Sequence, residues 1–123
     1  MEQQERLSRL IREKCVNMDL SSYMLLLKNI RNKLSSERVK KISSVLKAVS
    51  NINRLKIILL LFERDLCGCE INVLLGLSQP TTSHHLQMLE EAGLISSRVA
   101  WRWKHYALSN NGRKFLKFLL DIH

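Results

Sequence analysis

The chain has 123 residues, of which 46% are hydrophobic and 25% charged, and this is the composition of a single soluble globular domain. Lysine and arginine number 20 against 11 for aspartate and glutamate, so the net charge is +9 and favours a polyanionic partner, either nucleic acid or an anionic membrane surface. The longest apolar run covers residues 57–62, far short of the roughly 20 residues of a spanning helix, which excludes a transmembrane segment.

The charged first twelve residues lack the apolar core of a signal peptide, and three cysteines cannot all pair within one chain. We therefore expect a cytoplasmic protein with reduced thiols and without membrane association. Only four glycines and one proline are present, which argues against an all-β fold built on many tight turns.

Apolar spacing predicts helices throughout the first half of the chain. We expect them at residues 1–18, 23–34 and 38–49. Asn51 should cap a further helix over residues 52–63, whose apolar positions nearly encircle it and predict the central buried helix.

The next segment has the pattern of two short helices joined by a glycine-containing turn. A helix over residues 71–75 should end at Gly76, and Ser78 should cap a second helix that runs to about Ala92 and stops at Gly93. Such a pair forms a helix-turn-helix when its second helix can enter a groove of DNA.

Residues 94–98 and 103–108 are rich in β-branched and aromatic side chains and predict a two-stranded hairpin with its tip near Ala100 and Trp101. A last helix over residues 110–122 should follow. It is expected to turn four apolar side chains inward, namely Phe115, Leu116, Leu119 and Ile122. The predicted fold is mainly α with a small β-hairpin: a dimeric winged helix-turn-helix over residues 37–123, preceded by a helical extension over residues 1–36.

The second helix of the pair should expose short polar groups at its N-terminal end. Glutamine pairs with adenine edges, hydroxyls accept or donate to either base pair, and a helix N-terminus favours phosphate. The residues expected to contact DNA from this helix are Ser78, Gln79, Thr81, Thr82, Ser83 and His84. The alternative is an ordinary solvated helix face, and His85 is expected to be packed or to cap.

The hairpin carries Arg98, Arg102 and Lys104 beside two tryptophans, Trp101 and Trp103. Basic side chains interleaved with aromatic ones suit contacts to phosphate or to the minor groove. The two tryptophans could equally serve to pack the hairpin.

The run Leu-Ser-Gln-Pro-Thr-Thr-Ser-His-His-Leu at residues 77–86, followed by Glu-Ala-Gly-Leu-Ile at residues 91–95, resembles the helix-turn-helix of the ArsR/SmtB family of winged-helix metalloregulatory repressors. The resemblance covers about residues 45–120. It implies a transcriptional repressor, not an enzyme, that binds a palindromic operator in double-stranded DNA. Trp101 stands where the family usually has glycine, so we expect the wing tip to use other backbone angles.

Cys67 and Cys69 lie just before the first helix of the helix-turn-helix, and at a helix start Cys67 can lie outside the helix and Cys69 inside it. Paired thiolates select soft ions. The segment Leu-Cys-Gly-Cys-Glu at residues 66–70 is similar to the metal box of arsenic and cadmium sensors in the family. That resemblance implies As(III) as the favoured inducer, with Sb(III), Cd(II), Pb(II) and Zn(II) as further possibilities, and Cys15 as a third ligand.

Three alternatives stay open at this point. Cys15 continues an apolar stripe of its helix and could be a core residue. The thiols could form a redox sensor, or the chain could be a ligand-independent or architectural DNA-binding protein. We also expect the thiols to lie apart from the DNA-reading face, and the homodimer to use the N-terminal helices and residues 110–122.

Overall fold

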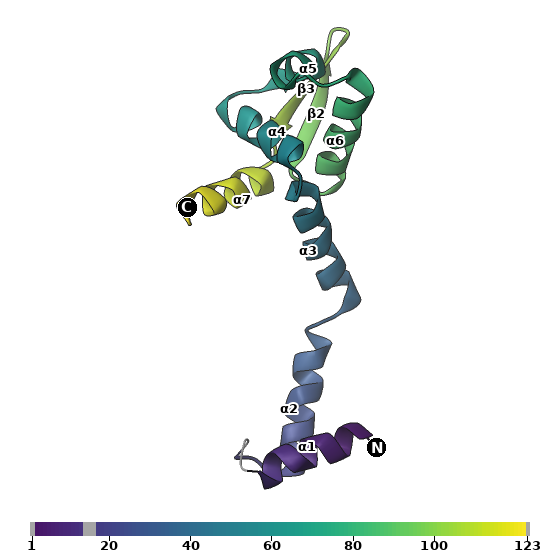
Figure 1. Cartoon of the computed structure of the whole chain (residues 1–123), viewed down its shortest axis with the longest axis vertical. Coiled ribbons are helices and arrows are strands. Elements are labelled where there is room, and N and C mark those ends of the chain that lie inside the picture. Colours follow the sequence, from purple (N-terminus) through teal and green to yellow (C-terminus); the bar gives the residue numbers. More distant parts are fainter. Residues whose placement is uncertain (1, 14–16, 123) are drawn as a thin grey trace. The chain divides into compact units, whose positions relative to one another are not determined.

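The computed structural model describes residues 2–13 and 17–122, which fall into two compact units, Met1–Val39 and Lys40–His123 (Figure 1). Cys15 lies outside the described residues. Over the described part, no helix has both the length and the apolar character required to cross a bilayer.

The N-terminal unit contains helices α1 (Glu2–Arg12) and α2 (Leu20–Asn32). The prediction of one helix over residues 1–18 is wrong at its end, because α1 stops at Arg12 and residues 17–19 are not helical. Asp19 explains the early start of α2: its Oδ2 accepts a hydrogen bond from the Ser22 amide at 3.1 Å, so it is the N-cap. The hydrogen bonds from Ser22 also lower the pKa of the Asp19 carboxyl.

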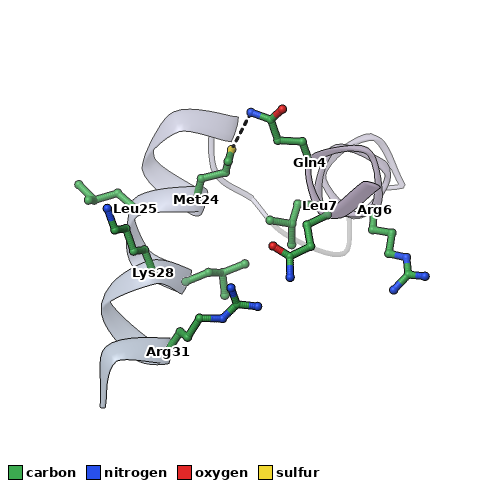
Figure 2. Close-up of a pocket in the computed structure, with 9 residues that line it drawn as sticks. Gln4, Arg6, Leu7, Met24, Leu25, Lys28 and Arg31 are labelled. Carbon is green, nitrogen blue, oxygen red and sulfur yellow. Dashed lines mark hydrogen bonds between the residues drawn. The ribbon is translucent and has the colours of Figure 1, made fainter. Parts of the chain in front are cut away.

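Between α1 and α2 lies an open hollow of about 680 Å³ (Figure 2). Its apolar lining includes Leu7 and Met24, and the Gln4 side-chain amide lies 3.8 Å from the Met24 sulfur. No residue of either helix is buried among the residues that the structure describes. The two helices therefore have apolar surface but no enclosed core.

The C-terminal unit contains most of helix α3 and seven further elements. In chain order these elements are α3 (Ser36–Val49), α4 (Ile52–Glu63), β1 (Leu66–Cys67), α5 (Gly68–Leu75), α6 (Gln79–Glu91), β2 (Ile95–Ala100), β3 (Trp103–Leu108) and α7 (Asn110–Asp121). The core is a cluster of aliphatic side chains contributed by all of these elements.

Helix α4 begins and ends where the sequence predicts. The Asn51 side chain accepts a hydrogen bond from the Arg54 amide at 3.1 Å, which confirms the predicted cap. Ile57, Ile58 and Leu61 are buried, but Ile52 and Leu59 are exposed. The expectation of burial all round is therefore wrong: α4 buries one side, and its opposite side is left uncovered in this chain.

The sheet has three strands in the order β1-β3-β2, all antiparallel, rather than the two predicted. Strand β1 is two residues long, with Leu66 opposite Tyr106 and Cys67 opposite His105. Strand β3 has the predicted bounds, whereas β2 starts one residue later and ends two residues later than expected. No local pattern marks a two-residue strand, because its strand partner, β3, lies about 40 residues away in the sequence.

The wing tip is formed by Trp101, which has φ +64° and a side chain that is 91% exposed. The expectation that this turn avoids the angles of glycine is therefore wrong. Tryptophan itself adopts the left-handed conformation, which costs roughly 1–2 kcal/mol for a residue with a Cβ. Its exposure also excludes packing within this hairpin as its role.

Helix α7 places Leu116 in the core and half-buries Phe115 and Leu119. Ile122, predicted to face inward, is 68% exposed. Gly112 lies in the first turn of α7, buried directly over the backbone of Leu94. A Cβ at this position would overlap the Leu94 carbonyl oxygen, so glycine is required for α7 to approach the start of the hairpin.

Gly112→Ala should therefore lower the free energy of unfolding by about 1–3 kcal/mol through overlap with a backbone that has little freedom to move. Urea denaturation measures the change. Gly68→Ala is the matched control: its Cβ would lie 3.8 Å from the Tyr106 ring, an ordinary contact, so a change within about 0.5 kcal/mol is expected. Equal losses in both variants would contradict this account of Gly112.

Candidate nucleic-acid interface and thiol pair

The turn between α5 and α6 is set by Gly76 and Ser78. Gly76 has φ +64° and ends α5, as predicted, with the Leu77 amide donating to the Asn72 carbonyl at 3.2 Å. The Ser78 hydroxyl accepts from the Thr81 amide at 3.3 Å and donates to the Thr81 hydroxyl at 2.8 Å. The predicted cap is confirmed, and its hydroxyl is engaged with Thr81.

Helix α6 exposes polar side chains at its N-terminal end and buries apolar side chains further along. Leu86 and Leu89 are buried, as predicted. The exposed polar side chains of this end are Gln79, Thr81, Ser83 and His84.

Thr82 differs from its neighbours and corrects the sequence-based expectation. The residue is only 2% exposed, and its hydroxyl oxygen has no hydrogen-bond partner within the described part of the chain. A side chain this deeply buried does not present its hydroxyl to a base edge. In this conformation Thr82 is therefore not available to read bases directly.

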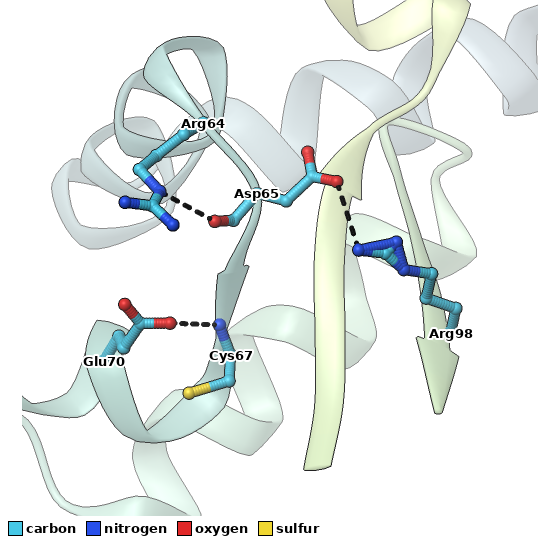
Figure 3. Close-up of polar contacts among 5 residues, drawn as sticks. All are labelled: Arg64, Asp65, Cys67, Glu70 and Arg98. Carbon is cyan, nitrogen blue, oxygen red and sulfur yellow. Dashed lines mark hydrogen bonds and ion pairs between the residues drawn. The ribbon is translucent and has the colours of Figure 1, made fainter. Parts of the chain in front are cut away.

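The basic residues of the hairpin divide between its two faces. In the strand register Arg98 is opposite His105 and Val99 is opposite Lys104, so Arg98 and Lys104 point to opposite faces. Arg98 lies 3.8 Å from the Asp65 carboxylate (Figure 3). Lys104 and Arg102 are exposed, and the Lys104 ammonium lies 5.6 Å from the centre of the Tyr106 ring.

A hollow of about 260 Å³ brings several of the candidates together, whereas Ser78, Thr81 and His84 do not line it. Gln79 and Ser83 of α6, and Arg102 and Lys104 of the wing, line it. Cys67 and Cys69 line the same hollow. The expectation that the thiols lie apart from the DNA-reading residues is therefore wrong, and Arg98 is absent from this group.

Cys67 occupies a junction between three elements. It is the last residue of β1, lies opposite His105 of the wing, and is the N-cap of α5 with extended backbone angles. Its amide donates to the Glu70 carboxylate at 3.0 Å (Figure 3). The hydrogen bonds from Cys67 hold the pKa of Glu70 below its ordinary value. Cys69 lies within the first turn of α5, as the sequence suggested, and is exposed.

The donor set for a soft ion is incomplete over residues 2–13 and 17–122. No three His, Cys, Asp or Glu side chains are grouped there in a way that would hold a metal. Cys67 and Cys69 are two of the three predicted thiolates, and the third, Cys15, lies outside the described residues. Two thiolates suit the soft-ion class but leave at least one coordination position of As(III) to another donor.

Sequence reasoning missed one feature near this site. Arg54 of α4 is 9% exposed and hydrogen-bonded to His85 of α6, which confirms that His85 is packed but gives it a partner that was not foreseen. The available signal was the spacing of Arg54, three and four residues before Ile57 and Ile58, which puts a charge on an apolar side of the helix where it requires partners.

Residues 51–97 match the family model described as bacterial regulatory protein, arsR family. The chain is 44% identical over 64 residues to the arsenical resistance operon repressor of Escherichia coli, covering 51% of this chain and 55% of that protein. It is 35% identical over 81 residues to the cadmium resistance transcriptional regulatory protein CadC of Listeria innocua, covering 65% and 68%. The chain thus spans about half the length of the first of these relatives.

Solved structures with the same fold include HlyU from Vibrio cholerae, with a TM-score of 0.64 and 29% identity over 72% of this chain and 98% of that one. A homodimeric winged helix-turn-helix DNA-binding domain of Mycobacterium bovis, described as a possible ArsR-family transcriptional regulator, has a TM-score of 0.64 and 25% identity, covering 71% and 81%. The helix-turn-helix and the three-stranded sheet thus form a winged helix.

The burial of Thr82 leads to a prediction about its hydroxyl. Thr82→Val keeps the side-chain shape and removes an unpaired buried oxygen, so the free energy of unfolding should rise by about 1 kcal/mol. Affinity for a duplex that the wild-type protein selects from a random-sequence pool should stay within about twofold. Urea denaturation and fluorescence anisotropy measure the two quantities.

Thr81→Val is the matched control on the same turn, because its hydroxyl accepts from Ser78 and its residue is exposed. It should lower stability slightly. A large loss of sequence-selective affinity in Thr82→Val would contradict this account and show that the Thr82 hydroxyl takes part in reading bases.

Proposed function

Because the chain belongs to the arsR family of bacterial regulatory proteins, which are DNA-binding transcriptional repressors, we propose that it holds a palindromic operator as a homodimer until a soft metal or metalloid ion binds Cys67 and Cys69. Its relatives and its fold are those of transcriptional regulators rather than enzymes. Residues 37–123 would form the DNA-binding domain and residues 1–36 an extension for dimerisation and ligand binding.

The observation that carries this proposal is the hollow shared by the thiols and the polar residues of α6 and the wing. An ion held by Cys67 and Cys69 would lie beside Gln79 and Arg102, so its charge and volume would act directly on groups that face DNA. The ion needs to change operator affinity by only about 1–3 kcal/mol to give 5–150-fold regulation.

Sequence readout would come from the exposed N-terminal end of α6 and phosphate binding from the wing. Gln79, Ser83 and His84 would reach base edges in the major groove. Arg102 and Lys104 would neutralise backbone phosphates, whereas Arg98 is held by Asp65 on the other face of the hairpin. Arg98 would therefore contribute less than the sequence suggests.

The homodimer is supported by apolar side chains that this chain alone leaves uncovered. Ile42 and Leu46 of α3, and Phe118 and Ile122 of α7, are all exposed. The Mycobacterium bovis domain of the same fold is described as homodimeric. The N-terminal helices also lack an enclosed core, and a second copy would supply the missing cover.

We favour As(III) as the inducer for two reasons: its preference for thiolate ligands, and the similarity of this chain to arsenical resistance repressors. The ion prefers soft thiolates, and three cysteines would complete its coordination if Cys15 joined the pair. Similar proteins are named for arsenical and for cadmium resistance. The same donors would accept Sb(III), Cd(II), Pb(II) or Zn(II), with a further ligand from water or a carboxylate where needed.

Through Cys67, a bound ion would act on both the wing and the helix-turn-helix. The residue pairs with the wing strand β3 and caps α5, the first helix of the helix-turn-helix. A shift of Cys67 toward Cys69 would therefore move the wing and α5 relative to each other. Glu70, which accepts the Cys67 amide hydrogen bond, would resist such a shift.

DNA contacts are tested by matched substitutions. Gln79→Ala should reduce affinity for the selected duplex by about tenfold and leave affinity for random DNA nearly unchanged, because it removes a base contact. Arg102→Ala should weaken both complexes and make the slope of log K against log salt shallower by about one. Fluorescence anisotropy over a salt series measures both effects.

Lys56→Ala, which removes a positive charge from the exposed surface of α4, is the control for Arg102 and should leave the salt slope unchanged. Equal effects of Lys56→Ala and Arg102→Ala would mean that net charge, and not the wing, binds DNA.

Release by the inducer is tested with thiol variants. Cys67→Ser and Cys69→Ser should still bind the selected duplex, since serine is nearly isosteric, but should no longer release it when As(III) is added. Cys15→Ser should weaken the response to As(III) by about tenfold or more while sparing ions that accept water as a ligand. Gel-shift titration, with thiolate charge-transfer absorbance in parallel, follows both steps.

Removal of As(III) by a competing dithiol should restore the wild-type complex, which controls for denaturation. Thiol variants that still release DNA on addition of As(III) would exclude this pair as the sensor. Release by peroxide but by none of the ions would establish the redox alternative instead.

A further inference from the structure

Arg54 is nearly buried, yet its guanidinium makes three hydrogen bonds to two different helices. Its Nε donates to the Ala48 carbonyl at 2.6 Å, and its Nη2 donates to the Lys47 carbonyl at 3.2 Å. Its Nη1 lies 3.1 Å from Nδ1 of His85. The side chain thus starts on α4 and joins the C-terminal end of α3 to the middle of α6.

The end of α3 compensates the buried charge of Arg54. Lys47 and Ala48 are in the last turn of α3, where carbonyl groups lack helical partners and the helix dipole is negative. No carboxylate pairs with Arg54 among residues 2–13 and 17–122. The guanidinium therefore depends on these carbonyls and on His85 for its hydrogen bonds.

The third bond specifies the protonation state of His85. A guanidinium donates hydrogen bonds and accepts none, so Nδ1 of His85 must carry a lone pair and the ring must be neutral with its proton on Nε2. Burial, followed by the positive charges of Arg54 and His84, lowers the pKa of His85 from 6.5. A protonated ring would lose this bond and place two cations in contact.

We infer that Arg54 and His85 are positioning residues, which fix helix α6 against the end of α3 only while His85 is neutral. This link goes beyond contact with DNA, although its effect on DNA affinity rests on the proposed function. His85 directly follows His84 and lies three residues after Thr82 on the same helix. Arg54 thus gives the end of α3 a direct hydrogen-bonded connection to α6, next to the polar end of that helix.

The groups that face His85 determine the direction of the pH effect. They are Arg54 from α4 and His84 from α6, together with the α3 carbonyls that hold Arg54. Lys47 and Glu91 line a neighbouring hollow between α3 and α6. Because the folded pKa is depressed, the contribution of neutral His85 is complete above pH 6.5 and is lost as the pH falls below it.

Histidine NMR of the full chain tests the link without DNA. The ¹⁵N shifts of His85 should identify a neutral ring protonated at Nε2, and the ring should titrate below 6.5. In Arg54→Met the His85 pKa should rise toward 6.5, because a positive neighbour is lost. A His85 ring that is protonated on Nδ1, or whose titration ignores Arg54→Met, would overturn the inference.

Arg54→Lys is the second variant, in case methionine does not support folding. It keeps the charge, but an ammonium lacks the planar fork that joins three acceptors, so the α6 amides should exchange about tenfold faster with solvent. Exchange of the α6 amides at the wild-type rate would mean that Arg54 does not position α6.

His85→Gln supplies the functional test. Its side-chain oxygen can accept from Arg54 at every pH. At about pH 7.5 its affinity for the selected duplex should match the wild type, and at a pH about one unit below the His85 titration observed by NMR it should bind at least about fivefold more tightly than the wild type. The ratio of the two proteins removes effects of pH on DNA and on His84, which they share.

Lys56→Ala is the control for the pH profile, because Lys56 lies exposed on α4 and is not a hydrogen-bond partner of Arg54 or His85. Its ratio to the wild type should stay flat with pH. Parallel pH profiles for wild type and His85→Gln would overturn the role of His85 in DNA binding. Absence of DNA binding by every protein at every pH would refute the proposed function alone, since the NMR measurements stand without it.

Discussion

The pairing of β1 with β3 is the constraint on which the candidate site depends. Two residues, Leu66 and Cys67, form this strand, and the partner residues Tyr106 and His105 come from the wing about 40 positions later. The pairing buries Leu66 in the core and places Cys67 where α5 begins. Without it Cys67 would lie on the connection between α4 and α5, with no defined relation to the wing.

The same short strand links the three parts of the shared hollow. The wing contributes Arg102 and Lys104, α6 contributes Gln79 and Ser83, and β1 with the start of α5 contributes the two thiols. A different local feature shapes each of these elements. Trp101 forms the wing tip with left-handed backbone angles, Ser78 caps α6, and Glu70 accepts a hydrogen bond from the Cys67 amide. Under the proposed function, this arrangement would place the ligand site directly beside the DNA-binding residues.

A second connection reaches α6 from its other side. Arg54 uses the carbonyl groups at the end of α3 to satisfy a buried positive charge and then holds His85. The thiol pair and the arginine thus contact α6 or its neighbours from different sides, through α5 and through α3. If the two proposals hold, thiol ligands and protonation would act on the recognition helix through separate contacts.

The sequence by itself determined the helix-turn-helix, because its signals are local. Asn51, Ser78, Gly76 and Gly93 stop or start helices through hydrogen bonds and backbone angles within a few residues, and the exposed polar end of α6 follows from its cap. The helix boundaries near residues 12 and 20 were predicted wrongly: α1 ends at Arg12 rather than at residue 18, and the Asp19 cap starts α2 at Leu20. Only the tertiary structure decided the strand β1, the burial of Thr82, the separation of Arg98 from Lys104, and the Arg54–His85 bond. Each of these depends on a partner about 30 or more residues away, or on which side of an element meets the core, and no pattern within a short window contains that information.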